Sequence, residues 1–77
     1  MMVLAFVLIV TRPGKEEEVV KKLKERPEVE EAYIVYGEYD VVVKLRAESV
    51  SKLRDIVLNE IRSLDGVEKT ITLIVAE

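Results

Sequence analysis

The most chemically suggestive part of this 77-residue chain is a short segment that carries acidic and aromatic side chains around a glycine. It consists of Tyr36, Gly37, Glu38, Tyr39 and Asp40. The β-rich runs on either side, residues 29–36 and 39–46, indicate a hairpin with Gly37 near its tip. A second pair of polar side chains, Thr70 and Thr72, lies on the last β-rich run. These seven residues are the candidate ligand contacts.

The other residue types exclude most catalytic chemistry. The chain has no His, Cys or Trp, so neither a Ser–His nor a Cys–His nucleophile system can be built. The acidic clusters, residues 16–18 and residues 28–31, are better explained by the charge preference of a helix start and by a solvated surface. No glycine-rich phosphate loop occurs. We therefore predict no catalytic residue, no metal site, no cofactor and no enzyme activity.

Length and charge bound the class of protein. A chain of 77 residues, taken as the single domain 1–77, can build only a modest core, which makes oligomerisation a natural source of additional stability. The net charge of −3 argues against direct nucleic-acid binding. The apolar run 1–10 is too short to span a membrane and lacks the features of a signal peptide, so we expect a cytoplasmic protein. The high charged fraction without Cys or Gln is typical of hyperthermophiles.

Hydrophobic periodicity predicts six elements. We expect strands over residues 3–10, 29–36, 39–46 and 67–76, and an amphipathic helix over residues 15–26 that Pro27 ends. A second helix begins after Ser49 as N-cap, carries its apolar side chains at helical spacing, and ends at Asp65 and Gly66.

The element order is βαββαβ, and its two halves match at an offset of 38 residues, as Val3 and Val41 illustrate. Either a duplication or the pattern itself can explain the match. Both predict an α+β, ferredoxin-like fold: an antiparallel four-stranded sheet with two helices on one face and the first and third strands at its centre.

One face of this sheet is left without helices. The polar residues Asp40, Lys44 and Arg46 place Val41, Val43 and Leu45 toward the helices, and the offset then assigns the opposite, open face to Leu4, Phe6 and Leu8. The same reasoning adds residues of the outer strands to that face: Ala32, Ile34, Tyr36, Thr70, Thr72 and Ile74. A register slip of one residue would exchange the faces. We predict an oligomer interface that includes Leu4, Phe6, Leu8, Ile34 and Ile74.

Two segments resemble a known family. Residues 35–43, with Gly37, Tyr39 and Asp40, and residues 66–75, with Gly66-Val67 followed by Thr70 and Thr72, are similar to the hairpin and closing strand of the Lrp/AsnC effector domain. The resemblance implies dimerisation through the sheets, a ring of dimers such as an octamer, and an amino-acid ligand between dimers. Full regulators of that family also carry a helix-turn-helix, which this sequence does not show, so the resemblance is to stand-alone members. The leading hypothesis is then an amino-acid sensor, and mixed assembly with a helix-turn-helix regulator is one way in which it would act on a DNA-binding relative.

The resemblance suggests how an amino acid would be held. Asp40, as first choice, or Glu38 would accept from the ligand ammonium, while turn amides near Gly37 and the Thr70 and Thr72 hydroxyls would donate to its carboxylate. Tyr36 or Tyr39 would contact its side chain. Alternatively Asp40 satisfies turn amides and the threonines are ordinary strand residues. The competing functions are an oligomerisation scaffold without ligand and, third, a small dimeric α+β barrel enzyme.

Overall fold

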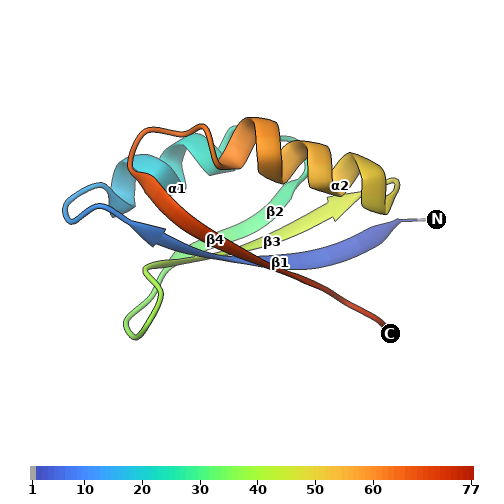
Figure 1. Ribbon diagram of the computed structural model, residues 1–77, viewed down its shortest axis with the longest axis horizontal. Helices are drawn as coiled ribbons and strands as arrows, with labels where there is room; N and C mark the ends of the chain where they lie inside the picture. The colour runs from blue at the N-terminus through green and yellow to red at the C-terminus, as the bar shows by residue number, and fades with distance from the viewer. Residues whose placement is uncertain (1) are drawn as a thin grey trace.

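The computed structural model describes residues 2–77, and it shows two helical segments covering one face of a curved sheet (Figure 1). The elements in chain order are β1 (Val3–Thr11), α1 (Glu16–Lys24), β2 (Val29–Ile34), β3 (Val41–Ala47), α2 (Val50–Ile56), the π-helical turn η1 (Val57–Ile61) and β4 (Val67–Ile74). The strands lie in the order β2-β3-β1-β4, and every neighbouring pair is antiparallel. The predicted ferredoxin-like α+β fold, with β1 and β3 at the centre, is confirmed.

The core lies between the sheet and the helices. On β1 and β3 every second residue is buried, including Ala5, Val7 and Val43. Val19 and Leu23 of α1 pack onto them, as do the buried side chains of α2 and η1, namely Leu53, Ile56, Val57 and Ile61. Burial of each such aliphatic side chain contributes about 1.5–3 kcal/mol to folding.

Local sequence signals account for most helix boundaries. Ser49 caps α2, because its side-chain oxygen accepts a hydrogen bond from the Lys52 amide at 3.0 Å. Helix α1 has acidic residues in its first turn and basic residues in its last, which suits the helix dipole. It is shorter than the predicted 15–26 span, and the predicted second helix continues from α2 into the π-helical turn η1, which periodicity did not indicate.

The assignment of the central strands to faces is confirmed, whereas that of the edge strands is wrong. Leu4, Phe6 and Leu8 lie on the face of the sheet that the helices do not cover, because the alternating β1 residues between them are the buried ones. Directly opposed residues of an antiparallel pair share a face, and five of the six edge residues predicted to be on the open face pair with core residues. The pairs are Ala32 with Val43, Ile34 with Val41, Thr70 with Ile9, Thr72 with Val7, and Ile74 with Ala5. Tyr36 lies in the loop beyond β2.

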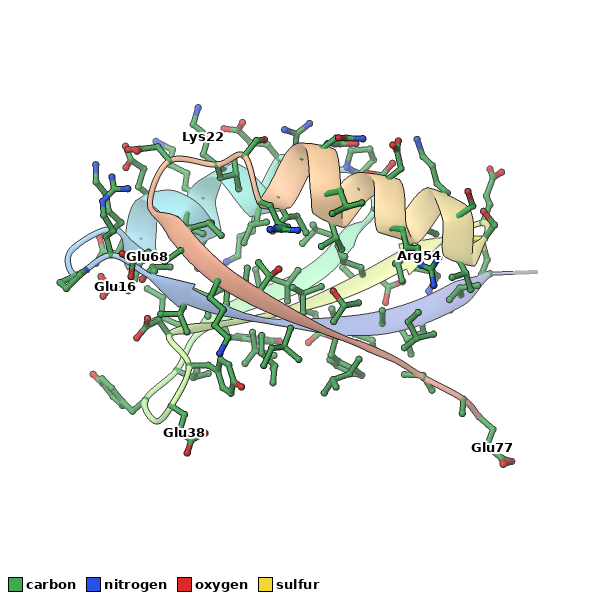
Figure 2. All side chains as sticks on the ribbon, viewed as in Figure 1. Glu16, Lys22, Glu38, Arg54, Glu68 and Glu77 are labelled. Atoms are coloured by element: carbon green, nitrogen blue, oxygen red, sulfur yellow. The ribbon has the colours of Figure 1, made fainter. Side chains whose placement is uncertain are left out.

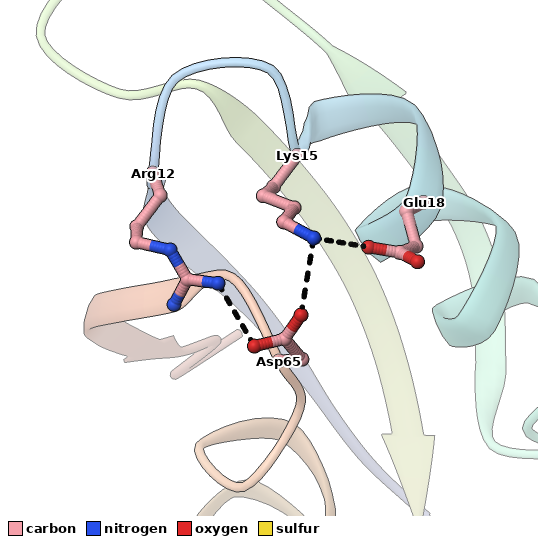
Figure 3. A network of polar contacts seen from close by, with 4 residues as sticks. All are labelled: Arg12, Lys15, Glu18 and Asp65. Carbon is pink, nitrogen blue, oxygen red and sulfur yellow. Dashed lines mark hydrogen bonds and ion pairs between the residues drawn. The ribbon is translucent and has the colours of Figure 1, made fainter.

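An ion-pair network joins the turn after β1 to the turn before β4 (Figure 3). The Asp65 carboxylate contacts Arg12 Nη2 at 2.8 Å through one oxygen and Lys15 Nζ at 3.2 Å through the other, and Lys15 also contacts Glu18. The hydrogen bond from Arg12, followed by that from Lys15, lowers the pKa of Asp65. A carboxyl with a lowered pKa stabilises the fold above its unfolded-state pKa, and this contribution is lost as the pH falls through the folded-state pKa.

We therefore expect Asp65→Asn to lower the melting temperature at neutral pH and low salt. The decrease should be only a few degrees, because exposed ion pairs are individually weak. The difference from wild type should shrink as the pH falls below the ordinary carboxyl range, since wild type then loses the same charge. Calorimetric melts of both proteins across that range check this, with Asp55→Asn as a control outside the network. A difference that persists unchanged in acid would contradict the electrostatic explanation.

Candidate ligand-binding and assembly surfaces

The loop between β2 and β3 projects away from the helices, on the open side of the sheet (Figure 1). Its base is closed by a 2.8 Å hydrogen bond from the Val35 amide to the Asp40 carbonyl. Within residues 2–77, the amides of positions 36–39 donate no hydrogen bond. Gly37 has a φ of +138°, so the tip takes a turn that other residues rarely adopt. The loop thus presents several free backbone donors at one place.

The side chains of the loop tip are exposed. Tyr36 is fully exposed, and Glu38, at the tip, points away from the body of the protein (Figure 2). Tyr39 is half-buried. A carboxylate, an aromatic ring and free amides therefore lie within four consecutive residues. These groups could contact an ammonium group, an apolar side chain and a carboxylate, respectively, which are the three parts of an amino-acid zwitterion.

Asp40 is held at the base of this loop by β1. Its Oδ2 accepts from the Thr11 amide at 2.8 Å and lies 3.5 Å from the Thr11 hydroxyl, while its own amide donates to the Ile9 carbonyl at 2.9 Å. This arrangement matches the alternative in which Asp40 satisfies backbone amides. Of the two acids considered for the ligand ammonium, Glu38 is the one without a hydrogen bond to other residues among positions 2–77.

Thr70 and Thr72 do not join the loop within one chain. They pair with Ile9 and Val7, so they lie on the helix side of the sheet, where they line a groove with α2 and η1. The structure therefore brings together Tyr36, Gly37, Glu38, Tyr39 and Asp40 and separates the two threonines from them. Only another subunit could add these hydroxyls to a site at the loop.

The open face of the sheet is the second candidate surface. One row across all four strands is apolar, because Leu8 is flanked by Val42 and Ile71, and Val42 by Tyr33. In the next row Leu73 lies beside Phe6 and is 51% exposed. Tyr33, Ile71 and Leu73 were not predicted to lie on this face. The pairing of Tyr33 with Val42 in the predicted hairpin could have identified Tyr33.

Charged groups on the β2–β3 side of this face are already paired. Arg46 Nε donates to Glu30 Oε2 at 2.6 Å, and Lys44 Nζ lies 3.4 Å from Glu31 Oε2. The bond from Arg46 lowers the pKa of Glu30, and the bonds from the Tyr33 hydroxyl and then Lys44 lower that of Glu31. Both carboxylates therefore stay ionised at neutral pH and keep their partners, so covering this face would not leave them as unpaired charges.

No group of three or more acidic, His or Cys side chains suited to a metal ion occurs within residues 2–77. No helix in the same span is long and apolar enough to cross a membrane.

Comparison with known proteins identifies related domains. Residues 4–77 match the family model described as the Lrp/AsnC ligand binding domain. The HTH-type transcriptional regulator FL11 of Pyrococcus furiosus is 44% identical over 73 residues, which cover 95% of this chain and 48% of the regulator. Its Pyrococcus origin agrees with the hyperthermophile-like composition. This chain thus spans about half the length of the curated relatives it matches, and these are named as transcriptional regulators and not as enzymes.

Two solved structures extend the comparison. TTHA0845 from Thermus thermophilus is 40% identical, with a TM-score of 0.93 over 97% of this chain and 94% of that one. AsnC of Escherichia coli is 30% identical, with a TM-score of 0.91 over 97% of this chain and 51% of that one.

Proposed function

The chain belongs to the Lrp/AsnC ligand-binding domain family, and from this premise we propose that it is a self-associating regulatory module that binds an amino acid at the β2–β3 loop. The observation that carries the proposal is the loop tip, where the amides of positions 36–39 donate no hydrogen bond within residues 2–77 and Glu38 supplies an exposed carboxylate on the same four residues. The amides would donate to the ligand carboxylate, and Glu38 would accept from its ammonium group. Tyr36 and Tyr39 would contact the ligand side chain.

The site is proposed to lie between subunits. A loop that projects from the sheet and carries a fully exposed tyrosine offers one wall of a site but does not enclose a ligand, so a neighbouring subunit would supply the opposite wall. Asp40 would act chiefly by holding the base of the loop on Thr11.

Association is proposed to use the open face. Leu4, Phe6 and Leu8 would form its centre, together with Val42, Ile71 and Leu73. Ile34 and Ile74 pair with the core residues Val41 and Ala5, so they lie on the helix side of the edge strands and would not be covered by this interface. The proposed assembly is a dimer formed through the open face, or a ring of such dimers.

The amino-acid site can be tested by calorimetry with each of the standard amino acids. We expect at least one to bind, and Glu38→Gln to weaken it about 10- to 100-fold, because a hydrogen bond to a charged group contributes roughly 1.5–3 kcal/mol. Asp40→Asn should have a smaller effect, since its amide oxygen can still accept from Thr11. Glu48→Gln, an exposed acid outside the loop, serves as the matched control.

Two outcomes would change the proposal. If Glu38→Gln binds the same amino acid as tightly as wild type, the ammonium contact is wrong. If no amino acid binds at millimolar concentration, the protein is an oligomerisation scaffold.

A further inference from the structure

A groove lies on the helix side of the sheet, between β4 and the helical segment α2–η1. Its volume is about 440 Å³, which is within the range of small-molecule sites. Its lining residues are Leu53, Arg54, Val57, Leu58, Arg62, Thr70, Thr72 and Ile74. We call this the β4–α2 groove. It is separate from the β2–β3 loop, which projects from the opposite side of the sheet.

The inner part of the groove is apolar. Leu53 and Val57 belong to the hydrophobic core and are almost fully buried, and Ile74 borders them from β4. The part of a ligand that enters between α2 and β4 therefore meets aliphatic side chains, and an aliphatic group would be favoured there over a polar one.

The groove is also lined by the two arginines that have no acidic partner within residues 2–77. Three of the five arginines are ion-paired: Arg12 with Asp65 at 2.8 Å, Arg26 with Glu60 at 2.9 Å, and Arg46 with Glu30 at 2.6 Å. Arg54 and Arg62 form no ion pair within residues 2–77, and both line this groove. Figure 2 shows the Arg54 side chain extending from α2 toward the sheet.

The remaining polar groups complete a set of donors. Thr70 and Thr72 contribute two hydroxyls opposite the arginines, and no carboxylate lines the groove. Glu68 borders only the neighbouring depression, which Arg62 shares. A guanidinium is always charged and suits the geometry of a carboxylate, whereas a ligand ammonium group would meet like charge and no acidic acceptor.

We propose that the β4–α2 groove binds a small aliphatic carboxylate that carries no ammonium group, such as a short branched-chain fatty acid or the corresponding 2-oxo acid. The carboxylate is held by the guanidinium of Arg62, which borders the same end of the groove as Thr70, with the hydroxyls of Thr70 and Thr72 beside it. Arg54, eight residues earlier and so about 12 Å away along the helical segment, adds positive charge to the groove. The aliphatic chain contacts Leu53, Val57 and Ile74. This site is independent of the amino-acid site proposed at the β2–β3 loop.

Isocaproate, leucine and isohexanol provide a matched set of probes, because they share one branched carbon skeleton and differ in the groups at one end. Amide NMR titration of the isotope-labelled protein at low salt reports both affinity and location. We expect isocaproate to shift amides of α2, η1 and β4 and to bind the groove at least about tenfold more tightly than leucine or isohexanol. α-Ketoisocaproate, in a parallel titration, distinguishes an oxo acid from a simple acid as the preferred ligand.

The double variant Arg54→Gln/Arg62→Gln should weaken isocaproate binding at least about tenfold, since the charge-assisted contact with Arg62 and the positive charge of Arg54 are both removed. Lys21→Gln/Lys22→Gln, which removes the same charge from exposed positions on α1, should leave it unchanged. Thr72→Val, which keeps the side-chain shape, should weaken it by a smaller factor. If the double variant does not fold by circular dichroism, the single variant Arg62→Gln, which removes the guanidinium that borders Thr70, is compared with Lys22→Gln instead.

The proposal is overturned if isocaproate causes no shifts in the groove at about 10 mM, a concentration at which even weak binding is visible. It is also overturned if the lysine and arginine variants lose affinity equally, or if leucine binds the groove as well as isocaproate. Shifts that leucine causes at the β2–β3 loop test the amino-acid site alone, so either proposal can fail without the other.

Discussion

Phe6→Glu is expected to convert the protein from an assembly into single chains. Phe6 lies at the centre of the open face, between Lys44 on β3 and Leu73 on β4, and apolar neighbours continue along β1 in both directions. On a free chain the glutamate would be hydrated at little cost. In an apolar interface it would be desolvated, and its neighbour Lys44 is already paired with Glu31 at 3.4 Å. The substitution should therefore raise the dissociation constant by at least about a thousandfold.

Light scattering at micromolar concentration measures this directly. Wild type should have a mass of at least two chains and Phe6→Glu that of one, while circular dichroism shows that the variant is folded. Val50→Glu makes the same chemical change at a 40% exposed residue on the helix side and should leave the mass unaltered. A wild-type mass equal to one chain would refute the interface on the open face.

Gly66→Ala should be among the most destabilising single substitutions, although it adds only one methyl group. Gly66 has a φ of +96°, and a Cβ there would lie 2.7 Å from Lys15 Cβ and 3.3 Å from Val19 Cγ2. Its carbonyl also accepts from the Arg12 amide at 2.8 Å, which restricts any shift of the backbone. Left-handed strain and crowding together should cost about 2–4 kcal/mol of unfolding free energy.

Gly14→Ala separates these two causes. Gly14 also has a positive φ, of +86°, but no atom lies within 4 Å of the added Cβ, so only the strain of about 1–2 kcal/mol remains. Thermal or denaturant unfolding should therefore give Gly66→Ala a lower free energy of unfolding than Gly14→Ala. Equal losses would show that the contact with Lys15 does not matter.

The central strands and the helices could be predicted because each of their signals is local. In β1 and β3 a period of two separates the buried side chains from the others, and Lys44 and Arg46 mark which set cannot be core. The Ser49 cap and the turn at Gly66 likewise depend on a few neighbouring residues. These features gave the ferredoxin-like fold and the position of Leu4, Phe6 and Leu8.

The edge strands could not be assigned in the same way. Around Tyr33 in β2, and around Thr72 in β4, apolar residues occur at both alternating positions, so the period does not say which set faces the helices. Pairing with a central strand decides the face, and that pairing reversed the expected positions of Ile34 and Ile74.

The order of the elements, the open apolar face of the central strands and the unusual loop at residues 36–40 all follow from the amino-acid sequence. Which of the candidate polar groups come together depends on the three-dimensional fold. It attached Asp40 to Thr11, moved Thr70 and Thr72 to the far side of the sheet, and placed them beside Arg54 and Arg62. The reason is physical: contacts between distant residues depend on strand pairing and on helix placement, which no local periodicity contains.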